Sequence, residues 1–247
     1  MKKAFYDFNV HTYPESSTSI YQFFEVAKRY GYSGITITNH SNRQNKTDID
    51  LDKGIGIDAG AEIGDLGDFK VFLGVEIISD VSSLKDTIRR YRKKVNVLCI
   101  HGGDERINRI ACEDPRVDVL SHPECPDKCG LNHVLARSAA KNNVAIGFDL
   151  CSIIQKKSGS RSRALSFMAK NLSLLRKYNV AALITSNAHS IYELRAPRDM
   201  MALAGLFGMT KEEAFSGLST APWAIIERNK KNLIMDGVDE ICRGKNG

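Results

Sequence analysis

The sequence predicts an α/β fold, specifically a TIM-like, distorted parallel (β/α)7 barrel with extra C-terminal helices. One observation is that short apolar runs recur along the chain, each ending on polar, chemically capable residues. These runs lack strict alternation, which is typical of strands buried on both faces of a parallel sheet. A second observation is that helical apolar patterns separate the runs, as crossovers between parallel strands require. The predicted strands lie at residues 4–11, 34–40, 71–76, 95–101, 117–122, 144–149 and 181–190.

The length of 247 residues fits one barrel or two smaller domains, and the regular alternation favours a single domain over residues 1–247. An open doubly wound sheet is the alternative arrangement. Residues 230–247 are predicted to form a flexible tail. Because no segment approaches ~18 consecutive apolar residues, and the N-terminus enters a strand without a secretory stretch, we expect a cytoplasmic protein with no membrane partner. Its six cysteines are then expected to be reduced thiols.

In the first half of the chain, Ser19 and Gln22 have capping-box spacing and predict a helix that Gly31 ends. Residues 41–68 are rich in Asn, Asp and Gly and predict a long, partly irregular connection. Another helix is predicted to begin at Ser83. Its outer side carries basic residues, namely Lys85, Arg89, Arg90, Arg92, Lys93 and Lys94.

In the second half, apolar residues at helical spacing predict helices over 131–139 and 165–175, and such stripes are typical of core. Only helix signals follow the seventh strand. Pro197 suits a first turn, and Gly208 ends that helix. Thr210 with Glu213 makes a second capping box, and Pro222 starts a third segment. The chain contains no Gly-rich phosphate loop and no GxSxG motif.

Five of the six histidines lie at the ends of predicted strands, where barrels place their functional sites. The imidazoles and the carboxylate gathered there are groups that zinc, manganese or iron accept. Asn9, Asn39 and Asn187 stand where a di- or trinuclear hydrolytic site would need His or Asp. Because a neutral amide lacks the charge that clustered cations require, we expect no metal at this site. The expected ring comprises His11, His40, Glu76, His101, His122 and His189.

The ordered motifs resemble those of the polymerase and histidinol phosphatase superfamily of metal-dependent phosphoesterases. They are DFNVHT at 7–12, ITNH at 37–40, GVEI at 74–77, SHPE at 121–124 and SNAH at 186–189. Active members of that superfamily have His at position 9 and Asp at positions 39 and 187. With HGGDERINR at 101–109, VDVLSHPE at 117–124, LNHVLAR at 131–137, VAIGFDL at 144–150 and ELRAPRDM at 193–200, the chain is similar to the archaeal ribonuclease P protein component 3 family.

This resemblance implies a protein subunit of ribonuclease P, an RNA-based endoribonuclease that removes 5′ leaders from precursor tRNA. In that family the RNA supplies the catalytic centre and binds magnesium, so we expect no catalytic residue and no cofactor in the chain itself. The expected partners are the ribonuclease P RNA and a Pop5-like subunit, with precursor tRNA contacted indirectly. The barrel mouth is then expected to be a vestigial, hydrogen-bonded site formed by Asn9, His11, Asn39, His40, Glu76, His122, Asn187 and His189.

Basic residues near the ends of three strands are candidate RNA contacts, consistent with the formal net charge of +6. Residues 156–163 predict a flexible, cationic, hydroxyl-rich loop suited to phosphate, with a merely solvated loop as the alternative. Arg195 and Arg198 are expected to meet phosphate or to pair with Asp199. The complete set of candidates is Lys156, Lys157, Arg161, Arg163, Arg195, Arg198 and Arg106.

Two alternatives stay open from the sequence. One is a metal-dependent phosphoesterase that uses the ring of histidines. The other is a zinc site at His122, Cys125, Cys129 and His133, which the spacing disfavours because the first lies at a strand end and the last inside the following helix. Asp149 and His101 receive no role from the sequence.

Overall fold

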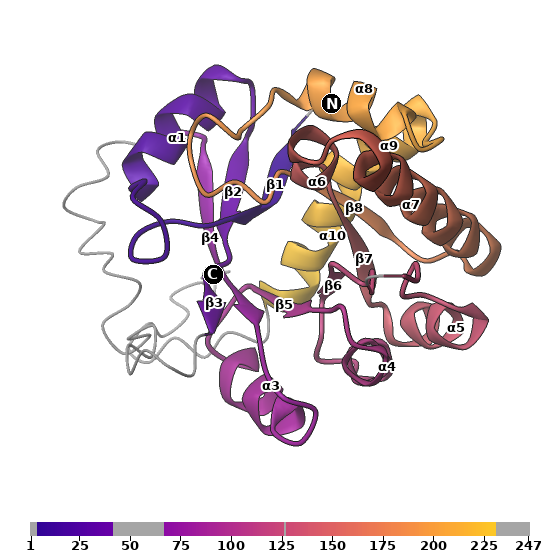
Figure 1. Cartoon of the computed structure of the whole chain (residues 1–247). Coiled ribbons are helices and arrows are strands. Elements are labelled where there is room, and N and C mark those ends of the chain that lie inside the picture. Colours follow the sequence, from indigo (N-terminus) through magenta and orange to yellow (C-terminus); the bar gives the residue numbers. More distant parts are fainter. Residues whose placement is uncertain (1–3, 42–66, 126, 231–247) are drawn as a thin grey trace, which may run out of the picture.

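The computed structural model describes residues 4–41, 67–125 and 127–230, and its centre is a parallel sheet (Figure 1). The strand order is β1-β2-β4-β5-β6-β7-β8. The sheet closes because Val10, at the end of β1, pairs with Ala188, beyond the end of β8. The His11 N–H donates to the Ala188 carbonyl across this seam at 2.8 Å. The predicted TIM-like barrel is therefore confirmed, and the open doubly wound alternative is wrong.

All seven predicted strands are present; six are shorter than expected at one end or both, and β4 is one residue longer at each end. The additional two-residue β3 continues beyond β2 and pairs with the end of β4, which sets His40 opposite Glu76. The strands are β1 (Tyr6–Val10), β2 (Gly34–Ile37), β3 (His40–Ser41), β4 (Lys70–Ile77), β5 (Val97–His101), β6 (Val119–Ser121), β7 (Ala145–Asp149) and β8 (Ala182–Thr185).

Helices surround the sheet, and both predicted capping boxes, Ser19 with Gln22 and Thr210 with Glu213, are formed. No helix in the described ranges is long and apolar enough to cross a membrane. Most of the predicted connection at 41–68 and of the predicted tail lies outside the described residues. The helices are α1 (Ile20–Arg29), α3 (Leu84–Arg92), α4 (Glu105–Glu113), α5 (His133–Asn142), α6 (Cys151–Gln155), α7 (Ser158–Tyr178), α8 (Pro197–Gly205), α9 (Lys211–Leu218) and α10 (Thr220–Asn229).

The predicted flexible loop at 156–163 is wrong, because α7 begins at Ser158. The first turn is stabilised by local hydrogen bonds to residues just before the helix rather than by a buried apolar face. The Ser160 hydroxyl donates to the Lys157 carbonyl at 2.6 Å, and Arg161 Nε donates to the Lys156 carbonyl at 2.8 Å. A Ser- and Gly-rich composition favours turns, but such side-chain bonds to the backbone also stabilise a helix start.

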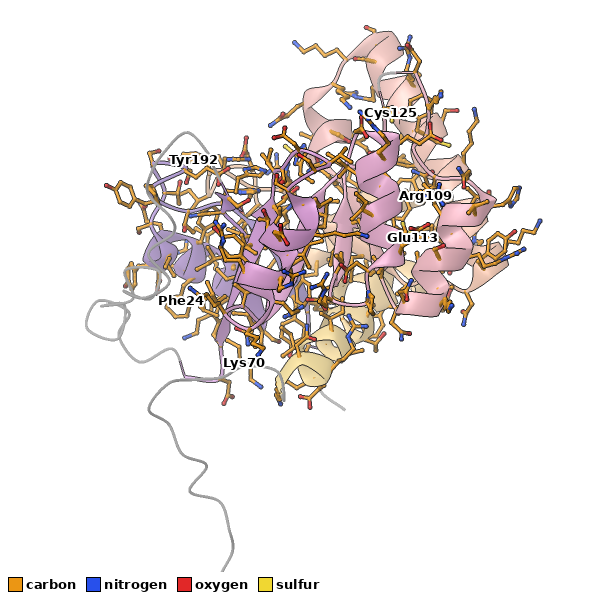
Figure 2. The ribbon with its side chains drawn as sticks, turned by 90° about the horizontal axis from the view of Figure 1, so that it is seen from below. Phe24, Lys70, Arg109, Glu113, Cys125 and Tyr192 are labelled. Atoms are coloured by element: carbon orange, nitrogen blue, oxygen red, sulfur yellow. The ribbon has the colours of Figure 1, made fainter. Side chains whose placement is uncertain are left out.

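The last helix of the described residues, α10, closes the amino end of the barrel (Figure 1). Ile225 and Ile226 pack with the buried apolar residues that fill the barrel interior, while Trp223 stacks on Tyr6 with ring centroids 5.5 Å apart. In the view from below, Lys70 lies beside α10 (Figure 2), and its Nζ is 4.5 Å from the Trp223 ring centroid. The strand residues in this interior layer are Tyr6, Phe8, Val97, Cys99, Val119, Ala145 and Leu183.

A polar cluster, here called the amino-end clasp, ties α10 to the barrel and consists of the buried residues Arg92, Asp118 and Asn229 and the exposed Arg228. Asp118 Oδ2 accepts from Arg92 Nη1 at 2.5 Å and from the Leu98 N–H at 2.8 Å. Asp118 Oδ1 accepts from Arg228 Nη2 and Asn229 Nδ2, each at 2.8 Å. A single carboxylate thus links α3, the start of β6 and α10.

Candidate functional site

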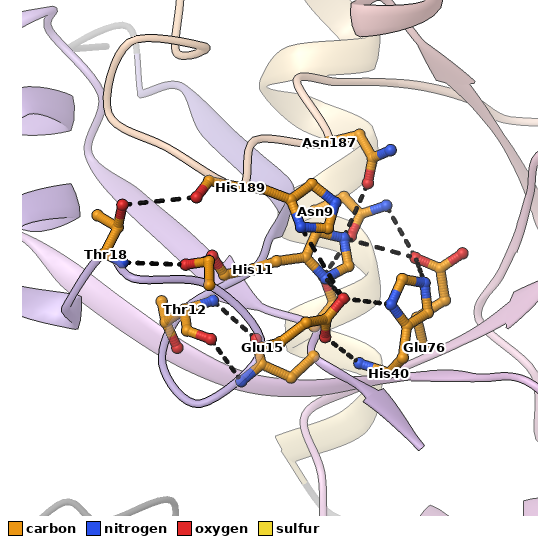
Figure 3. A network of polar contacts seen from close by, with 12 residues as sticks. Asn9, His11, Thr12, Glu15, Thr18, His40, Glu76, Asn187 and His189 are labelled. Atoms are coloured by element: carbon orange, nitrogen blue, oxygen red, sulfur yellow. Dashed lines mark hydrogen bonds and ion pairs between the residues drawn. The ribbon is translucent and has the colours of Figure 1, made fainter. Parts of the chain in front are cut away.

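The carboxyl ends of the strands bring the predicted mouth residues together around the buried side chain of Glu76 (Figure 3). Parallel strands end at the same edge of a barrel, which is why residues far apart in sequence meet there. Five polar side chains surround the carboxylate. The distances are 2.8 Å from Oε1 to His101 Nδ1, 3.9 Å from Oε1 to His122 Nε2, 3.0 Å from Oε2 to Asn9 Nδ2, 3.8 Å from Oε2 to His40 Nε2 and 4.0 Å from Oε2 to His11 Nε2.

A second carboxylate, Glu15, joins this site, and sequence reasoning missed it. Glu15 Oε1 lies 3.2 Å from His11 Nδ1 and also hydrogen-bonds His40 Nδ1, while Glu15 Oε2 accepts from the His40 backbone N–H at 2.7 Å. His189 Nδ1 is 3.9 Å away. The available signal was an acidic residue four positions after the histidine that ends the first strand.

The imidazole rings contact one another in a continuous row across the mouth, and those of His189, His11 and His40 are stacked. The rings of His11 and His189 are 4.2 Å apart with an interplanar angle of 7°, and those of His11 and His40 are 4.7 Å apart at 17°. His101 then bridges His40 and His122, with centroid distances of 5.4 and 4.8 Å. His101, which the sequence places in the expected ring but gives no role of its own, is part of the cluster and hydrogen-bonds Glu76.

The three asparagines act as hydrogen-bonding anchors within this site. Asn9 donates to Glu76 and accepts from the Thr38 hydroxyl, whereas Asn187 Oδ1 accepts from His11 Nε2 at 2.8 Å. Asn39 Oδ1 accepts from the Thr12 N–H at 2.7 Å and fixes the loop that follows β1. Asn187 has a φ of 50°, in the left-handed region where Asn is enriched.

Burial and neighbouring groups move several pKa values at the mouth in opposite directions. Burial opposes the ionisation of Glu76, but the hydrogen bond from His101 and the neighbouring imidazoles outweigh it and lower its pKa to about 2. For Glu15, burial is likewise outweighed by hydrogen bonds from His11 and His40, which hold its pKa well below the usual range. Burial lowers the pKa of His122 to about 4, so its imidazole is neutral at pH 7.

Two further carboxyl groups lie at the edges of the site and behave differently. Burial raises the pKa of Asp149 to about 7, and its Oδ2 is 3.8 Å from His122 Nδ1. Burial also raises the pKa of Asp7 to about 6; Asp7 Oδ1 accepts from the Ser186 N–H at 3.1 Å, while its Oδ2 has no hydrogen-bond partner. Ionisable groups with such shifted pKa values are typical of functional sites, although structural networks also produce them.

Two groups of three side chains have a metal-ligating arrangement, with the ligand atoms of each group within 4.8 Å of one another. They are His11, Glu15 and His40, and His40, Glu76 and His101. Two imidazoles with one carboxylate suit zinc or manganese. Asn9 Nδ2, however, donates a hydrogen bond to Glu76 Oε2, so this oxygen is not free to bridge two metal ions. The residues fit one ion in one triad better than a di- or trinuclear centre.

The four residues of the disfavoured zinc alternative, His122, Cys125, Cys129 and His133, do not form a metal-ligating group. Cys129 Sγ contacts the Leu131 carbonyl at 3.4 Å, and His133 Nδ1 lies 3.1 Å from the Tyr178 hydroxyl. Within the described ranges, the two mouth triads are the metal-ligating groups found. The disfavoured zinc alternative gains no support from this placement.

The candidate RNA-contact residues are all at least partly exposed, but they do not form one cluster. Lys156, Lys157, Arg161 and Arg163 surround the start of α7, and Arg163 Nη1 lies 3.5 Å from Asp127. Arg195 Nη1 donates to the Tyr192 and Leu194 carbonyls, both at 2.7 Å, rather than pairing with Asp199. The exposed residues Arg198, at the start of α8, and Arg106, on α4, complete the set.

Comparison with known proteins decides the family. A family model described as RNase P subunit p30 matches residues 4–232. The chain belongs to the RNase P subunit p30 family. Its curated relatives include a ribonuclease P protein component 3 from Methanococcoides burtonii, 43% identical with 96% of this chain and 94% of the relative covered. A protein of the same name from Methanosarcina barkeri is 39% identical with 98% of each chain covered.

Solved structures show the same fold as this p30 family member. A chain in the structure of archaeal ribonuclease P with mature tRNA superposes with a TM-score of 0.74 at 24% identity, covering 97% of this chain and 100% of that one. The metal-dependent tyrosine phosphatases of Bacillus subtilis and Streptococcus pneumoniae superpose with a TM-score of 0.57 at 16% identity, covering 93% and 96%. The barrel fold is thus shared by a chain of archaeal ribonuclease P and by metal-dependent tyrosine phosphatases.

Proposed function

We propose that this chain is the p30-type protein subunit of an archaeal ribonuclease P, the RNA-based endonuclease that removes 5′ leaders from precursor tRNA. The observation that supports this function is the family match over residues 4–232, together with 43% identity to a protein named ribonuclease P protein component 3. Those relatives are matched over nearly their whole length, so no large region of theirs lacks a counterpart here.

In this role the chain binds the ribonuclease P RNA together with a Pop5-like subunit and meets precursor tRNA indirectly. The catalytic centre and its magnesium belong to the RNA, and the chain contributes no catalytic residue or cofactor. The mouth network then serves as a structural scaffold. Asn9 and Asn187 support this assignment, because their amides hydrogen-bond Glu76 and His11 where the active superfamily members carry ligating side chains.

The direct test is reconstitution with the RNA and the Pop5-like protein from the same source. We expect the full chain to be recovered in a complex with both, and to increase cleavage of precursor tRNA by the RNA at limiting magnesium. A chain that binds neither component, although correctly folded, would contradict the proposal.

The competing function, a metal-dependent phosphoesterase, is favoured only by the two triads of metal-ligating side chains. Elemental analysis of the purified protein and an assay with a generic phosphomonoester separate the two functions. We expect no stoichiometric metal and no turnover. Two or more bound ions per chain, with turnover abolished by His11→Ala, would establish the phosphoesterase instead.

A further inference from the structure

Two adjacent covering helices, α5 and α7, contain no Asp or Glu at all. They pack against each other on one side of the barrel (Figure 1). Every charged side chain along their 10 and 21 residues is therefore basic. Apart from Arg161 and Arg163 near the start of α7, these residues are Arg137, Lys141, Lys170, Arg176 and Lys177.

Most of these basic side chains point outward, and they follow the repeat of the helix. Arg163, Lys170 and Lys177 recur every seven residues, which places them along one face of α7 at intervals of about 10.5 Å. Arg137 and Lys141, four residues apart, occupy one face of α5. Arg176 is different, because its Nε pairs with Glu213 of α9 at 2.7 Å.

At the junction of the two helices, two cationic side chains and one imidazole lie around one aromatic ring. The guanidinium carbon of Arg137 is 5.8 Å and the Lys177 Nζ is 5.7 Å from the Tyr178 ring centroid. The Tyr178 hydroxyl lies 3.1 Å from His133 Nδ1. An aromatic ring bordered by cations is an arrangement that holds both a phosphate and a neighbouring base.

Some basic residues on the neighbouring helices are neutralised by ion pairs within their own helix. On α4, Arg109 pairs with Glu113 at 2.9 Å, and on α3, Arg89 pairs with Asp86 at 3.1 Å. Among the described residues, no carboxylate forms an ion pair with Arg137, Lys141, Lys170 or Lys177. The positive charge of these four side chains on α5 and α7 is thus not neutralised by ion pairs among the described residues, and it can attract an anionic partner.

We propose that this outward face, defined by Arg137, Lys141, Lys170, Lys177 and Tyr178, binds the phosphate backbone of the ribonuclease P RNA. The proposal rests on the function proposed above and assigns the surface that performs it. RNA is favoured over an acidic protein because a protein interface has an apolar core, and Val134 is the one large apolar side chain exposed on either helix. An α7 of 21 residues is about 31 Å long and spans several phosphates.

The test compares two variants of the full chain that lose the same charge from different faces. The first carries Arg137→Gln, Lys141→Gln, Lys170→Gln and Lys177→Gln, and the matched control carries Lys85→Gln, Arg89→Gln, Arg90→Gln and Lys93→Gln on and just after α3. Glutamine keeps the helix propensity, and all eight positions are exposed. Affinity for the ribonuclease P RNA is measured over a series of salt concentrations.

Each phosphate contact contributes about 0.7 to 0.9 to the slope of log affinity against log salt. We expect the first variant to flatten this slope by about 3 units and the control by less than about 1. Equal losses, or a larger loss in the control, would overturn the proposal. The proposal would also be overturned if the first variant kept the wild-type slope but lost binding of the Pop5-like protein, because the face would then bind a protein.

Two double variants guard against a fold defect in the quadruple one. Arg137→Gln with Lys177→Gln, and Lys141→Gln with Lys170→Gln, should each remove about half of the slope change, with thermal midpoints close to that of the wild type. If the wild-type chain binds no ribonuclease P RNA at all, alone or with its partner, the proposed function itself fails. If the wild type binds and only the slopes disagree, the assignment of the face fails alone.

Discussion

The two ends of the barrel each bury a polar cluster, but they satisfy their polar groups differently. In the amino-end clasp, each oxygen of Asp118 accepts two hydrogen bonds, and Arg92 Nε is the one buried side-chain atom of the clasp without a hydrogen-bond partner. At the mouth, Asp7 Oδ2 and His40 Nε2 are buried and lack hydrogen-bond partners. Buried polar atoms are normally paired. The clasp therefore pairs its buried polar atoms more completely than the mouth network does.

The largest expected effect comes from breaking the clasp. Asp118→Ala leaves the Arg92 guanidinium, whose side chain is 10% exposed, without its counter-charge. Removing one partner of a buried ion pair costs about 3 to 5 kcal/mol, so we expect a loss of this size in the free energy of unfolding measured with urea.

The matched control for Asp118→Ala is Glu113→Ala, which breaks the exposed Arg109–Glu113 pair on α4 (Figure 2). We expect it to cost about 0.5 kcal/mol or less. Similar losses in the two variants would show that the clasp is no more important than a surface pair.

Because the mouth buries ionisable groups with shifted pKa values, the stability of the folded chain should depend on pH. Burial raises the pKa of Asp7 from 3.8 to about 6, so ionisation disfavours the folded state. The wild type should therefore lose stability relative to Asp7→Asn as pH rises from about 4 to 6, by about 3 kcal/mol at most. Urea denaturation at several pH values measures the difference.

Glu76→Gln provides the comparison of opposite sign. Because the folded-state pKa of Glu76 is lowered from 4.5 to about 2, its ionised form stabilises the folded chain above pH 4.5, and that contribution is lost as pH falls towards 2. We expect the disadvantage of Glu76→Gln to be full at pH 7 and to shrink in acid. If both variants follow the same pH trend, the two carboxyl groups do not differ as described.

A smaller effect is expected from returning a ligating group to the mouth. Asn187→Asp keeps an acceptor for His11 Nε2, adds a negative charge beside the His11, Glu15 and His40 triad, and suits the left-handed backbone. We expect manganese or zinc to bind at least about ten-fold more tightly, a gain of about 1.4 kcal/mol, in calorimetric titrations.

Asn179→Asp, at another left-handed asparagine, is the control for the added charge and should leave metal affinity unchanged. Equal affinities of the Asn187→Asp variant and the wild type would show that charge at position 187 does not limit metal binding.

The smallest effect is expected at the rim of the mouth. Arg161 and Arg163 are already engaged by backbone carbonyls and Asp127, so Lys156 and Lys157 are the better phosphate contacts of that group. Lys156→Gln with Lys157→Gln should flatten the salt slope of RNA binding by about 1 to 2 units without moving the thermal midpoint. An unchanged slope would leave these lysines as solvated surface.

The barrel and most of its mouth could be predicted from the sequence because both depend on local patterns. Apolar runs such as residues 144–149 predict a buried strand. Because all strands of a parallel barrel end at the same edge, the histidine or carboxylate that ends each run lies at that edge. Glu15 escaped prediction because it lies in the loop after β1, and its role depends on how that loop turns back over His40.

The clasp was harder to predict for a different reason. Asp118 stands inside an apolar run, where a buried carboxylate signals a partner but does not identify it, and its partners come from helices distant in sequence. The start of α7 was mistaken for a loop because Ser and Gly are weak helix formers. Its first turn depends on bonds such as that from Arg161 to the Lys156 carbonyl.

The position of α10 also determines when this protein can finish folding during its synthesis. Tyr6 belongs to the first strand to leave the ribosome. The residues that cover the amino end of the barrel belong to the last described helix and are Trp223, Ile225 and Ile226. Such distant pairings form slowly because a long loop must close first. Until residue 229 has emerged, the apolar interior lacks its cover, so we expect a stalled or truncated nascent chain to bind chaperones or to aggregate.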